Sequence, residues 1–530
     1  MNTRQLLGSL TLACGCAAAT AANTPTEVPP LFGDWWYIMP EGWHDATAPR
    51  FGDPCRNIPW FPYDRPGMYV PVNQPGAGHG GPTYSEGAWM SWYAMCIANQ
   101  FDRLGAPMGL LIRNRNCLFP YAVTDGNISP GVLPTALMNL PKLDYLLMDL
   151  EPWGENGTEM MRLNADAIVA LVRQHPNLRA SDAFIGNYGD WPGERDEANI
   201  WPHKRDRTQF RTGQGDPWDR NQFYHDHFNI AMPIAYPYEV YSRHSDPRVQ
   251  GENVTPNDRA AIFWAPIERV SVAARHLPRG HRLMPWITPY SAYDGDSEHY
   301  HAPPPTWDDL DAMVQHFRLR GANSYYVWST TKNETEHPDF DHQTFRDFSM
   351  DTWRSLDPLF DSVERVEVLN LDTNKTGGLE WSGGRAGNTV WILVSNMHDE
   401  LEQAAELPLI GDLPRETPLV APGEHLLLTY QVNAAVRDFD NDGDIDPGDY
   451  VAFITSVQNH TPPAWANTVG GNGADPRDVD CNGLVDLLDV LAVSYAYQGG
   501  LYDPAGENEN GSGGKTPSGR GALSNQPPRR

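Results

Sequence analysis

Short apolar runs alternate with stretches of helical periodicity over the first two thirds of the chain. The apolar runs occupy residues 35–39, 108–112, 143–150, 183–188, 228–236, 282–290 and 324–329, and helical spacing marks residues 85–104, 158–173, 258–276 and 307–319. Strands that alternate with helices indicate parallel βα units. This α/β pattern predicts a (β/α)8, TIM-like barrel over residues 31–361, although no strand can be placed in the Gly- and Pro-rich residues 44–84.

The pattern changes after Asp361. Strand-like runs at 366–369, 389–394 and 425–430 are separated by polar turns, which predicts a small β-sandwich over residues 362–431. Short amphipathic helices follow at 450–456 and 490–497, within a separate module at 436–500. Residues 503–530 are rich in Gly, Asn, Ser and Pro and lack apolar side chains to bury, so a disordered tail is expected there.

The N-terminus indicates export. Arg4 precedes an apolar stretch at 6–19 that is too short to span a bilayer, and Ala19-Thr20-Ala21 offers a cleavage site. We therefore expect a signal peptide at 1–22, a secreted or cell-surface protein, and no membrane span in the remainder. Four cysteines then remain, and a disulfide among the first three is compatible with that compartment, with the pairing left open: Cys55, Cys96, Cys117 and Cys481.

Charge and composition narrow the classes of partner. The net charge of -29 argues against nucleic acid and anionic membrane surfaces, which need basic patches, and it suits divalent cations. The 18 Trp and 22 Tyr fit a sugar-binding protein, in which rings stack on pyranose faces. They fit large cores equally well, so composition alone does not decide the function.

Two acidic repeats near the C-terminus have the spacing of calcium loops. Each places oxygen ligands at loop positions one, three, five, seven, nine and twelve around a central glycine, Gly443 or Gly483, as a flexible oxygen shell for Ca²⁺ requires. The predicted ligands are Asp438, Asp440, Asp442, Asp444, Asp446 and Asp449 in the first loop, and Asp478, Asp480, Asn482, Leu484, Asp486 and Asp489 in the second. Two Ca²⁺ sites are expected, and no cofactor is expected for the barrel.

Residues 436–500 resemble a type I dockerin, an EF-hand-like module. Both loops end in Asp where EF-hands usually have Glu, as dockerin loops do. The resemblance implies docking to a cohesin-like or cell-surface receptor module. The sequence departs from the family between the loops, where a longer stretch contains Pro462, Pro463 and Trp465.

The main catalytic candidates follow the apolar run at 143–150. Alternate residues of a strand share a face, so Asp149 and Glu151 are expected to point the same way at the end of the strand where barrel chemistry occurs. Two close carboxyl groups push their pKa values apart, which lets one of them hold a proton and act as an acid.

This run resembles the D-x-x-D-x-D-x-E strand of family 18 glycoside hydrolases. Asp144, Asp149 and Glu151 occupy its first, third and last acidic places, while Leu147 departs from the second. The D-x-E-x-W strand of hyaluronidases is matched completely by Asp149, Glu151 and Trp153. The resemblance implies a retaining, substrate-assisted mechanism. Glu151 is then the acid/base, and Asp149 orients the 2-acetamido group of the substrate.

Other strand ends supply candidate substrate contacts. By the same resemblance, Tyr236 contacts the acetamido oxygen and Trp328 forms the floor of the sugar site. Asn187 and Tyr188 are polar residues at a strand end. In an alternative two-carboxylate mechanism, Glu239 is the nucleophile across the barrel from Glu151.

Three functions remain open from the sequence. The first is a secreted glycoside hydrolase that cleaves an N-acetylated or otherwise complex polysaccharide. The second is a catalytically silent barrel that binds carbohydrate, suggested by the missing acid at Leu147. The third is a structural surface protein assembled through calcium.

Overall fold

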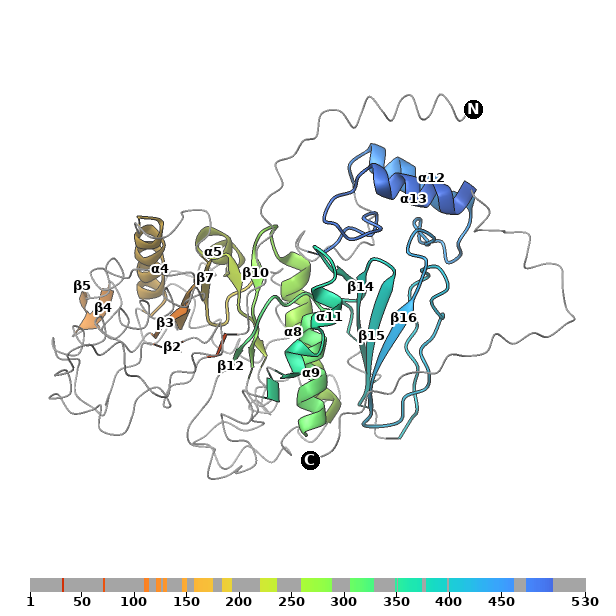
Figure 1. Cartoon of the computed structure of the whole chain (residues 1–530). Helices are drawn as coiled ribbons and strands as arrows, with labels where there is room; N and C mark the ends of the chain where they lie inside the picture. The colour runs from red at the N-terminus through yellow and green to blue at the C-terminus, as the bar shows by residue number, and fades with distance from the viewer. Residues whose placement is uncertain are drawn as a thin grey trace, which may run out of the picture.

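A computed structural model describes sixteen stretches of the chain (Figure 1). They are residues 31–32, 70–71, 109–113, 121–124, 127–130, 145–149, 157–174, 184–192, 220–235, 259–287, 306–327, 348–349, 351–373, 378–397, 400–461 and 473–498. The expected signal peptide, the strand at 35–39, the helix at 85–104 and the tail at 503–530 lie outside them. Among the described helices, none is long and apolar enough to cross a bilayer.

Parallel strands pair in chain order in two sheets that meet at the split strands. The pairs run from β2 (Val70–Pro71) through β3 (Gly109–Arg113), β6 (Tyr145–Asp149) and β7 (Phe184–Asn187) to β8 (Ile230–Ala231) and β10 (Arg282–Leu283). They continue through β9 (Ile234–Ala235), β11 (Trp286–Ile287) and β12 (Tyr326–Val327) to β1 (Leu31–Phe32). Since β8 and β9 continue one another, as do β10 and β11, the described strands occupy eight positions, the number in a (β/α)8 barrel.

Two barrel strands are interrupted at prolines. Pro233 separates β8 from β9, and Pro285 separates β10 from β11. Proline has no N–H to donate to the strand ladder, but its carbonyl oxygen still accepts. Trp286 donates its N–H to the carbonyl oxygen of Pro233 over 2.9 Å, and Tyr326 donates to Pro285 over 2.9 Å. Each of the strands predicted at 228–236 and 282–290 is therefore split in two. The hydrogen bonds between neighbouring strands nevertheless continue at both prolines.

Four of the described helices each follow a barrel strand, and a hairpin of β4 (Tyr121–Thr124) and β5 (Asn127–Pro130) is inserted after β3 (Figure 1). These four are α4 (Gly157–Gln174), α5 (Arg220–His227), α8 (Arg259–His276) and α9 (Trp307–Leu319). The helix predicted at 307–319 is confirmed in α9. It begins there because Thr306 and Asp309 form a capping box, each side chain accepting the other residue's backbone N–H.

An antiparallel sheet follows the barrel. Its order is β13 (Glu367–Val368), β14 (Leu379–Ala386), β15 (Thr389–Asn396) and β16 (His425–Gln431). One face packs Leu393 and Ala386 against Leu319 of α9 and Leu359 of α11 (Asp357–Phe360). The opposite face packs against residues 405–420 and against the C-terminal module.

The described residues of 362–431 differ from the predicted β-sandwich. They form one sheet, and the second layer over residues 400–437 makes only isolated bridges, such as the one between Gln403 and Val420. Prolines at 408, 414, 418 and 422 explain this, because each removes an N–H that a continuous strand would need.

A buried polar network joins the barrel to the sheet. The His316 side chain of α9 bonds the Ser382 hydroxyl through Nδ1 over 2.7 Å and the Ser395 hydroxyl through Nε2 over 2.8 Å. The His425 ring also contacts Ser395, over 2.7 Å, and Asp309, over 3.2 Å. Ser395 has 0% of its surface exposed, so this Asp–His–Ser chain is an interdomain contact that no substrate can reach.

Acidification is expected to weaken this contact. Burial, followed by nearby Arg320 and His425, holds the pKa of His316 well below its ordinary value of 6.5, so the folded protein keeps the ring neutral. The unfolded chain takes up the proton below about pH 6.5, so stability is lost as the pH falls, by up to about 1.4 kcal/mol per pH unit. Urea unfolding at pH 7 and pH 5 measures the loss in the free energy of unfolding. In His316→Gln, the difference between the two pH values should be smaller. The same pH dependence in His316→Gln and in the exposed control His460→Gln would refute this explanation.

Candidate functional site

The structure describes the predicted catalytic strand but not the side chains of the predicted catalytic pair. Asp149 ends β6, with its backbone opposite Arg113 of β3, and only its backbone is described. Glu151, Trp153, Tyr236, Glu239 and Trp328 lie outside the described residues. Because β6 lies between β3 and β7 in a parallel sheet, Asp149 is at the C-terminal end of the strands, where barrel enzymes place their chemistry. The roles assigned to these residues stay predictions.

The neighbouring strand end is described in full. Asn187 ends β7 and Tyr188 follows it, and the Tyr188 N–H donates to the carbonyl oxygen of Met148 in β6 over 2.8 Å. The Asn187 side chain is 0% exposed and donates to the Asp190 carboxylate over 2.6 Å. This amide therefore serves to hold a buried carboxylate at the barrel end, and its contact with a substrate stays a prediction.

Aromatic rings gather at the same end of the barrel. The Tyr188 ring meets the Trp286 ring edge-on at 4.7 Å between centroids, and Trp286 lies 4.1 Å from the Tyr326 ring. Sequence reasoning missed Asp190 and Trp286. The signal for Asp190 was its place two residues after the polar pair that ends β7, where barrel loops carry functional groups.

The two acidic loops share one backbone conformation. Asn441 and Cys481, at the fourth position of each loop, have φ of 61° and 58°, and Gly443 and Gly483, at the sixth, have φ of 95° and 89°. Left-handed φ is unusual outside glycine, so its recurrence at matching positions shows that the repeat in sequence is also a repeat in structure.

Each loop turns carboxylates toward one point. Oxygens of Asp438, Asp440 and Asp442 lie within 4.8 Å of one another, as do those of Asp478, Asp480 and Asp489. The other predicted carboxylate ligands are not grouped in this way. Asp446 and Asp486 instead accept N–H groups at the start of α12 (Pro447–Gln458) and α13 (Leu487–Gln498), from Gly448 and Leu488.

The closing aspartates fix each loop to its helix. Asp449 accepts the N–H of Phe439 over 2.5 Å and that of Asp446 over 2.7 Å, and Asp489 accepts those of Val479 and Asp486, each over 2.7 Å. Burial raises the pKa of Asp449 and of Asp489 to about 6. Burial also raises the pKa of Asp478 to about 7. Buried, crowded carboxylates favour a bound cation, and oxygen-only ligands at this spacing suit Ca²⁺.

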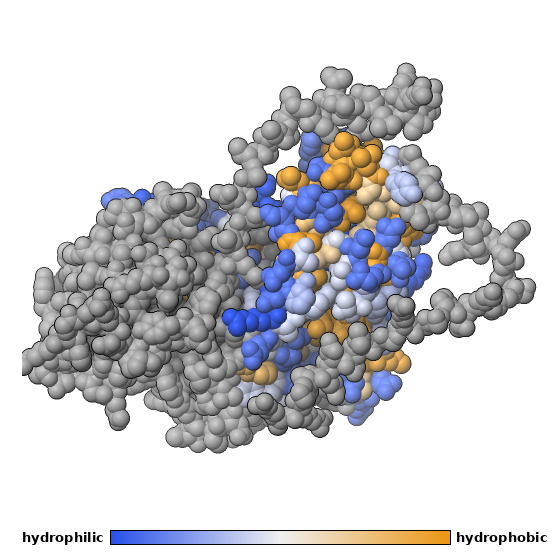
Figure 2. Space-filling model, in the orientation of Figure 1, coloured by the Kyte–Doolittle hydropathy of each residue, from blue (hydrophilic) through white to orange (hydrophobic). Residues whose placement is uncertain are grey.

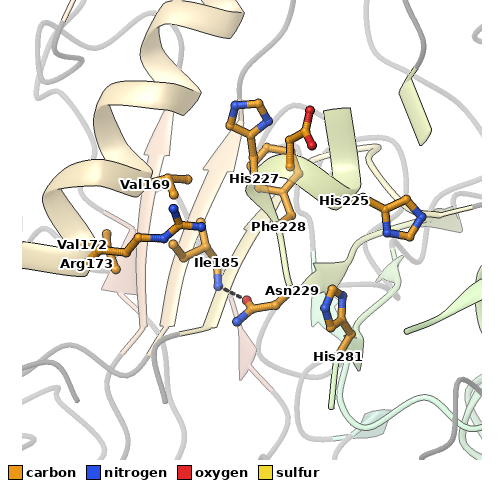
Figure 3. Close-up of a pocket in the computed structure, with 10 residues that line it drawn as sticks. Val169, Val172, Arg173, Ile185, His225, His227, Phe228, Asn229 and His281 are labelled. Atoms are coloured by element: carbon orange, nitrogen blue, oxygen red, sulfur yellow. Dashed lines mark hydrogen bonds between the residues drawn. The ribbon is translucent and has the colours of Figure 1, made fainter. Parts of the chain in front are cut away.

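A cavity of about 230 Å³ lies at the other end of the barrel (Figure 3). Its lining includes Arg173 at the end of α4, Asn229 before β8 and three imidazoles. His227 is bonded to Asp166 over 2.8 Å, and His281 to the Tyr224 hydroxyl over 2.9 Å. Burial, followed by His225, lowers the pKa of His281 to about 4, so its ring is neutral near pH 7. This end of a barrel ordinarily serves stability, and the cavity is separate from the predicted catalytic strand end.

Comparisons with known proteins add only distant similarities. No family model matches the chain, and no curated protein matches it. Among solved structures, it is similar to a conserved exported protein from Bacteroides fragilis, with 10% identity over 68% of this chain and 85% of that one and a TM-score of 0.30. It is similar to α-galactosidase I from Mortierella vinacea, with 10% identity over 78% and 96% of the two chains and a TM-score of 0.34.

A third similar structure is the cyclic α-maltosyl-(1→6)-maltose hydrolase from Arthrobacter globiformis, with 10% identity over 69% of this chain and 85% of that one and a TM-score of 0.35. TM-scores this low do not identify a fold that this chain shares with them. Its class is defined by its own strand pairing and loops: a parallel α/β barrel, an antiparallel sheet and a module with two acidic loops.

Proposed function

We propose that the barrel is a glycoside hydrolase that cleaves a complex, N-acetylated polysaccharide. The observation that carries the proposal is the position of Asp149 at the C-terminal end of a central barrel strand, with Glu151 two residues further along. The half-buried ring of Tyr188 at the neighbouring strand end supports it, because sugars stack on such rings, while the rings of Trp286 and Tyr326 are 0% exposed and pack behind it.

In the proposed mechanism, Glu151 protonates the glycosidic oxygen and later activates water. Asp149 orients the acetamido group, whose oxygen attacks the anomeric carbon as the bond to the leaving oxygen breaks. Water then attacks the same carbon and displaces the acetamido oxygen, so two inversions retain the configuration. Tyr236 and Trp328 line the sugar site, with Trp153 beside the acid. The two-carboxylate mechanism through Glu239 is the alternative for the same reaction.

A silent barrel that binds carbohydrate is the second candidate. Leu147, which replaces an acidic residue of the family 18 pattern, is 0% exposed within β6. A buried leucine cannot take part in a relay of carboxylates. This observation favours either the hyaluronidase version of the strand, which has no acid at this place, or the loss of catalysis.

We also propose that both acidic loops bind Ca²⁺ and that the module around them docks to a cohesin-like or cell-surface receptor, which would hold a secreted enzyme in place. Figure 2 shows apolar residues gathered near α12 and α13. The exposed apolar side chains of this part include Leu484, Leu487, Leu488, Leu491 and Tyr495, which are 49–68% exposed. Apolar side chains grouped on α13 and the loop before it support a protein partner.

Release of reducing ends from a panel that includes chitin and glycosaminoglycans tests the proposal with the calcium-loaded wild-type protein. Turnover of an N-acetylated polysaccharide supports the hydrolase. Binding in a pull-down with no turnover supports the silent barrel. Neither binding nor turnover, together with an assembly that disperses on chelation, supports the structural surface protein.

A further inference from the structure

The calcium module and the antiparallel sheet share one hydrophobic core. Phe453 of α12 and Val493 of α13, both 0% exposed, belong to the same buried cluster as Val390 and Ile392 of β15. Backbone hydrogen bonds also cross the boundary, from the N–H of Ala474 to the carbonyl oxygen of Val366 over 3.0 Å. The module is therefore built into the sheet domain, beside which α12 and α13 lie in Figure 1.

The buried guanidinium group of Arg385 binds the backbone of the second loop, residues 478–489. Arg385 of β14 is 0% exposed and donates to the carbonyl oxygens of Val479 over 2.8 Å and Asp478 over 3.0 Å. Arg385 also pairs with Glu367 over 2.5 Å, and Arg437 pairs with the same carboxylate over 2.7 Å. Two guanidinium groups thus face one carboxylate in the interior, and the carbonyl dipoles of the loop help to offset the excess positive charge.

The fourth position of the second loop is also buried in the sheet domain. Cys481 is 0% exposed, and its Sγ lies 3.7 Å from the carbonyl oxygen of Arg385. The N–H of Arg365 donates to the Cys481 carbonyl oxygen over 3.4 Å. The matching residue of the first loop, Asn441, is exposed, as are all residues at 440–444. The second residue of each loop, Phe439 or Val479, is buried in the shared core, but the fourth positions of the two loops have unequal surroundings.

We infer that calcium does different work in the two loops. In the second loop, bound calcium keeps the loop closed. It thereby fixes the carbonyl groups that bind Arg385 and maintains the fold of the sheet domain. In the first loop the metal leaves the sheet nearly unaffected. This inference rests on the proposed calcium binding.

The physical reason is linkage between metal and packing. Without metal, the second loop brings the Asp478, Asp480 and Asp489 carboxylates within 4.8 Å of one another, which favours opening. Opening of the loop removes two hydrogen-bond acceptors from the buried guanidinium group of Arg385. The loss of these hydrogen bonds lowers the free energy of unfolding of the sheet domain. Calcium that prevents opening must therefore stabilise the sheet, and the sheet must raise the calcium affinity of this loop by the same factor.

A matched pair of substitutions tests the inference. Asp440→Asn and Asp480→Asn remove one charge at the third position of each loop, and both side chains are exposed, so neither change disturbs the core. Calcium stoichiometry and affinity come from calorimetry on the full chain. Alkylation of Cys481 and amide exchange of residues 379–396, both read by mass spectrometry over a series of free calcium concentrations, report the opening of the sheet domain.

We expect chelation to expose Cys481 and to speed amide exchange in the sheet of the wild-type protein. Asp480→Asn should raise the calcium concentration needed for half protection by about tenfold or more, since ligand charge tunes affinity, while Asp440→Asn leaves it unchanged. Equal shifts in both variants, or sheet protection that persists on chelation, overturn the inference while calcium binding stands. Absence of calcium binding in calorimetry overturns the proposed calcium sites themselves.

Discussion

Glu151→Gln is expected to lower polysaccharide turnover by about two to four orders of magnitude, because an amide cannot deliver a proton to the leaving oxygen. Glutamine keeps the size of the side chain and its hydrogen-bonding reach, so substrate binding should change little. The measurement is the release of reducing ends under saturating substrate, which isolates kcat, beside a binding assay on the same polysaccharide.

Two further variants separate the mechanisms. Asp149→Asn should lower turnover strongly on an N-acetylated substrate if it orients the acetamido group. Glu239→Gln should keep nearly full activity in the substrate-assisted mechanism and lose it in the two-carboxylate one. Turnover by Glu151→Gln equal to that of the wild-type protein would remove Glu151 from the mechanism altogether.

Glu367→Gln is expected to destabilise the sheet domain by about 3–5 kcal/mol, since it removes the negative partner of two buried guanidinium groups. Burial alone would raise the pKa of this carboxyl, but Arg437 and Arg385 outweigh that effect and hold its pKa below the ordinary range. The folded protein therefore keeps the charge, and its loss leaves Arg385 and Arg437 uncompensated. Urea unfolding with saturating calcium at pH 7, read by amide exchange of residues 379–396, measures the change.

The exposed Glu402 offers a matched control for this substitution. Glu402→Gln should alter the free energy of unfolding by no more than about 0.5 kcal/mol, as is usual for surface positions. A loss below about 1 kcal/mol in Glu367→Gln would mean that the two arginines find other partners, and that the cluster does not anchor the sheet.

Periodicity predicted the barrel elements that local sequence determines. The helix at 307–319 was placed to the residue because its cap and its apolar spacing are both local. The splits in the strands at 228–236 and 282–290 could have been foreseen from Pro233 and Pro285, whose missing N–H groups interrupt a ladder.

Strand β14 escaped prediction because its sequence contains Gly383 and Gly384, a pair that normally indicates a turn. In the structure these glycines allow close packing. A Cβ at Gly383 would lie 2.8 Å from Ile392 Cδ1, and one at Gly384 would lie 2.9 Å from Leu359 Cδ2. Nothing local in the sequence shows that neighbours would need this space.

In the acidic loops, too, the features set by nearby residues could be predicted and those set by distant residues could not. Spacing alone located the carboxylates that come together, because their positions relative to one another are set within twelve residues. The contact of Arg385 with Asp478 joins residues 93 apart in the chain and has no local signal. The catalytic pair remains a motif-based prediction, because Glu151 lies outside the described residues.

The shared core of sheet and calcium module bears on how this chain could be cut or recombined. A module that can be moved between proteins ends at a linker with few contacts across it. Here a cut near residue 435 would uncover Val390, Ile392 and Val394 on one fragment and Phe453 and Val493 on the other. Fusion proteins that carry residues 436–500 alone should therefore aggregate. Fusion proteins that also carry the whole antiparallel sheet keep the shared core intact.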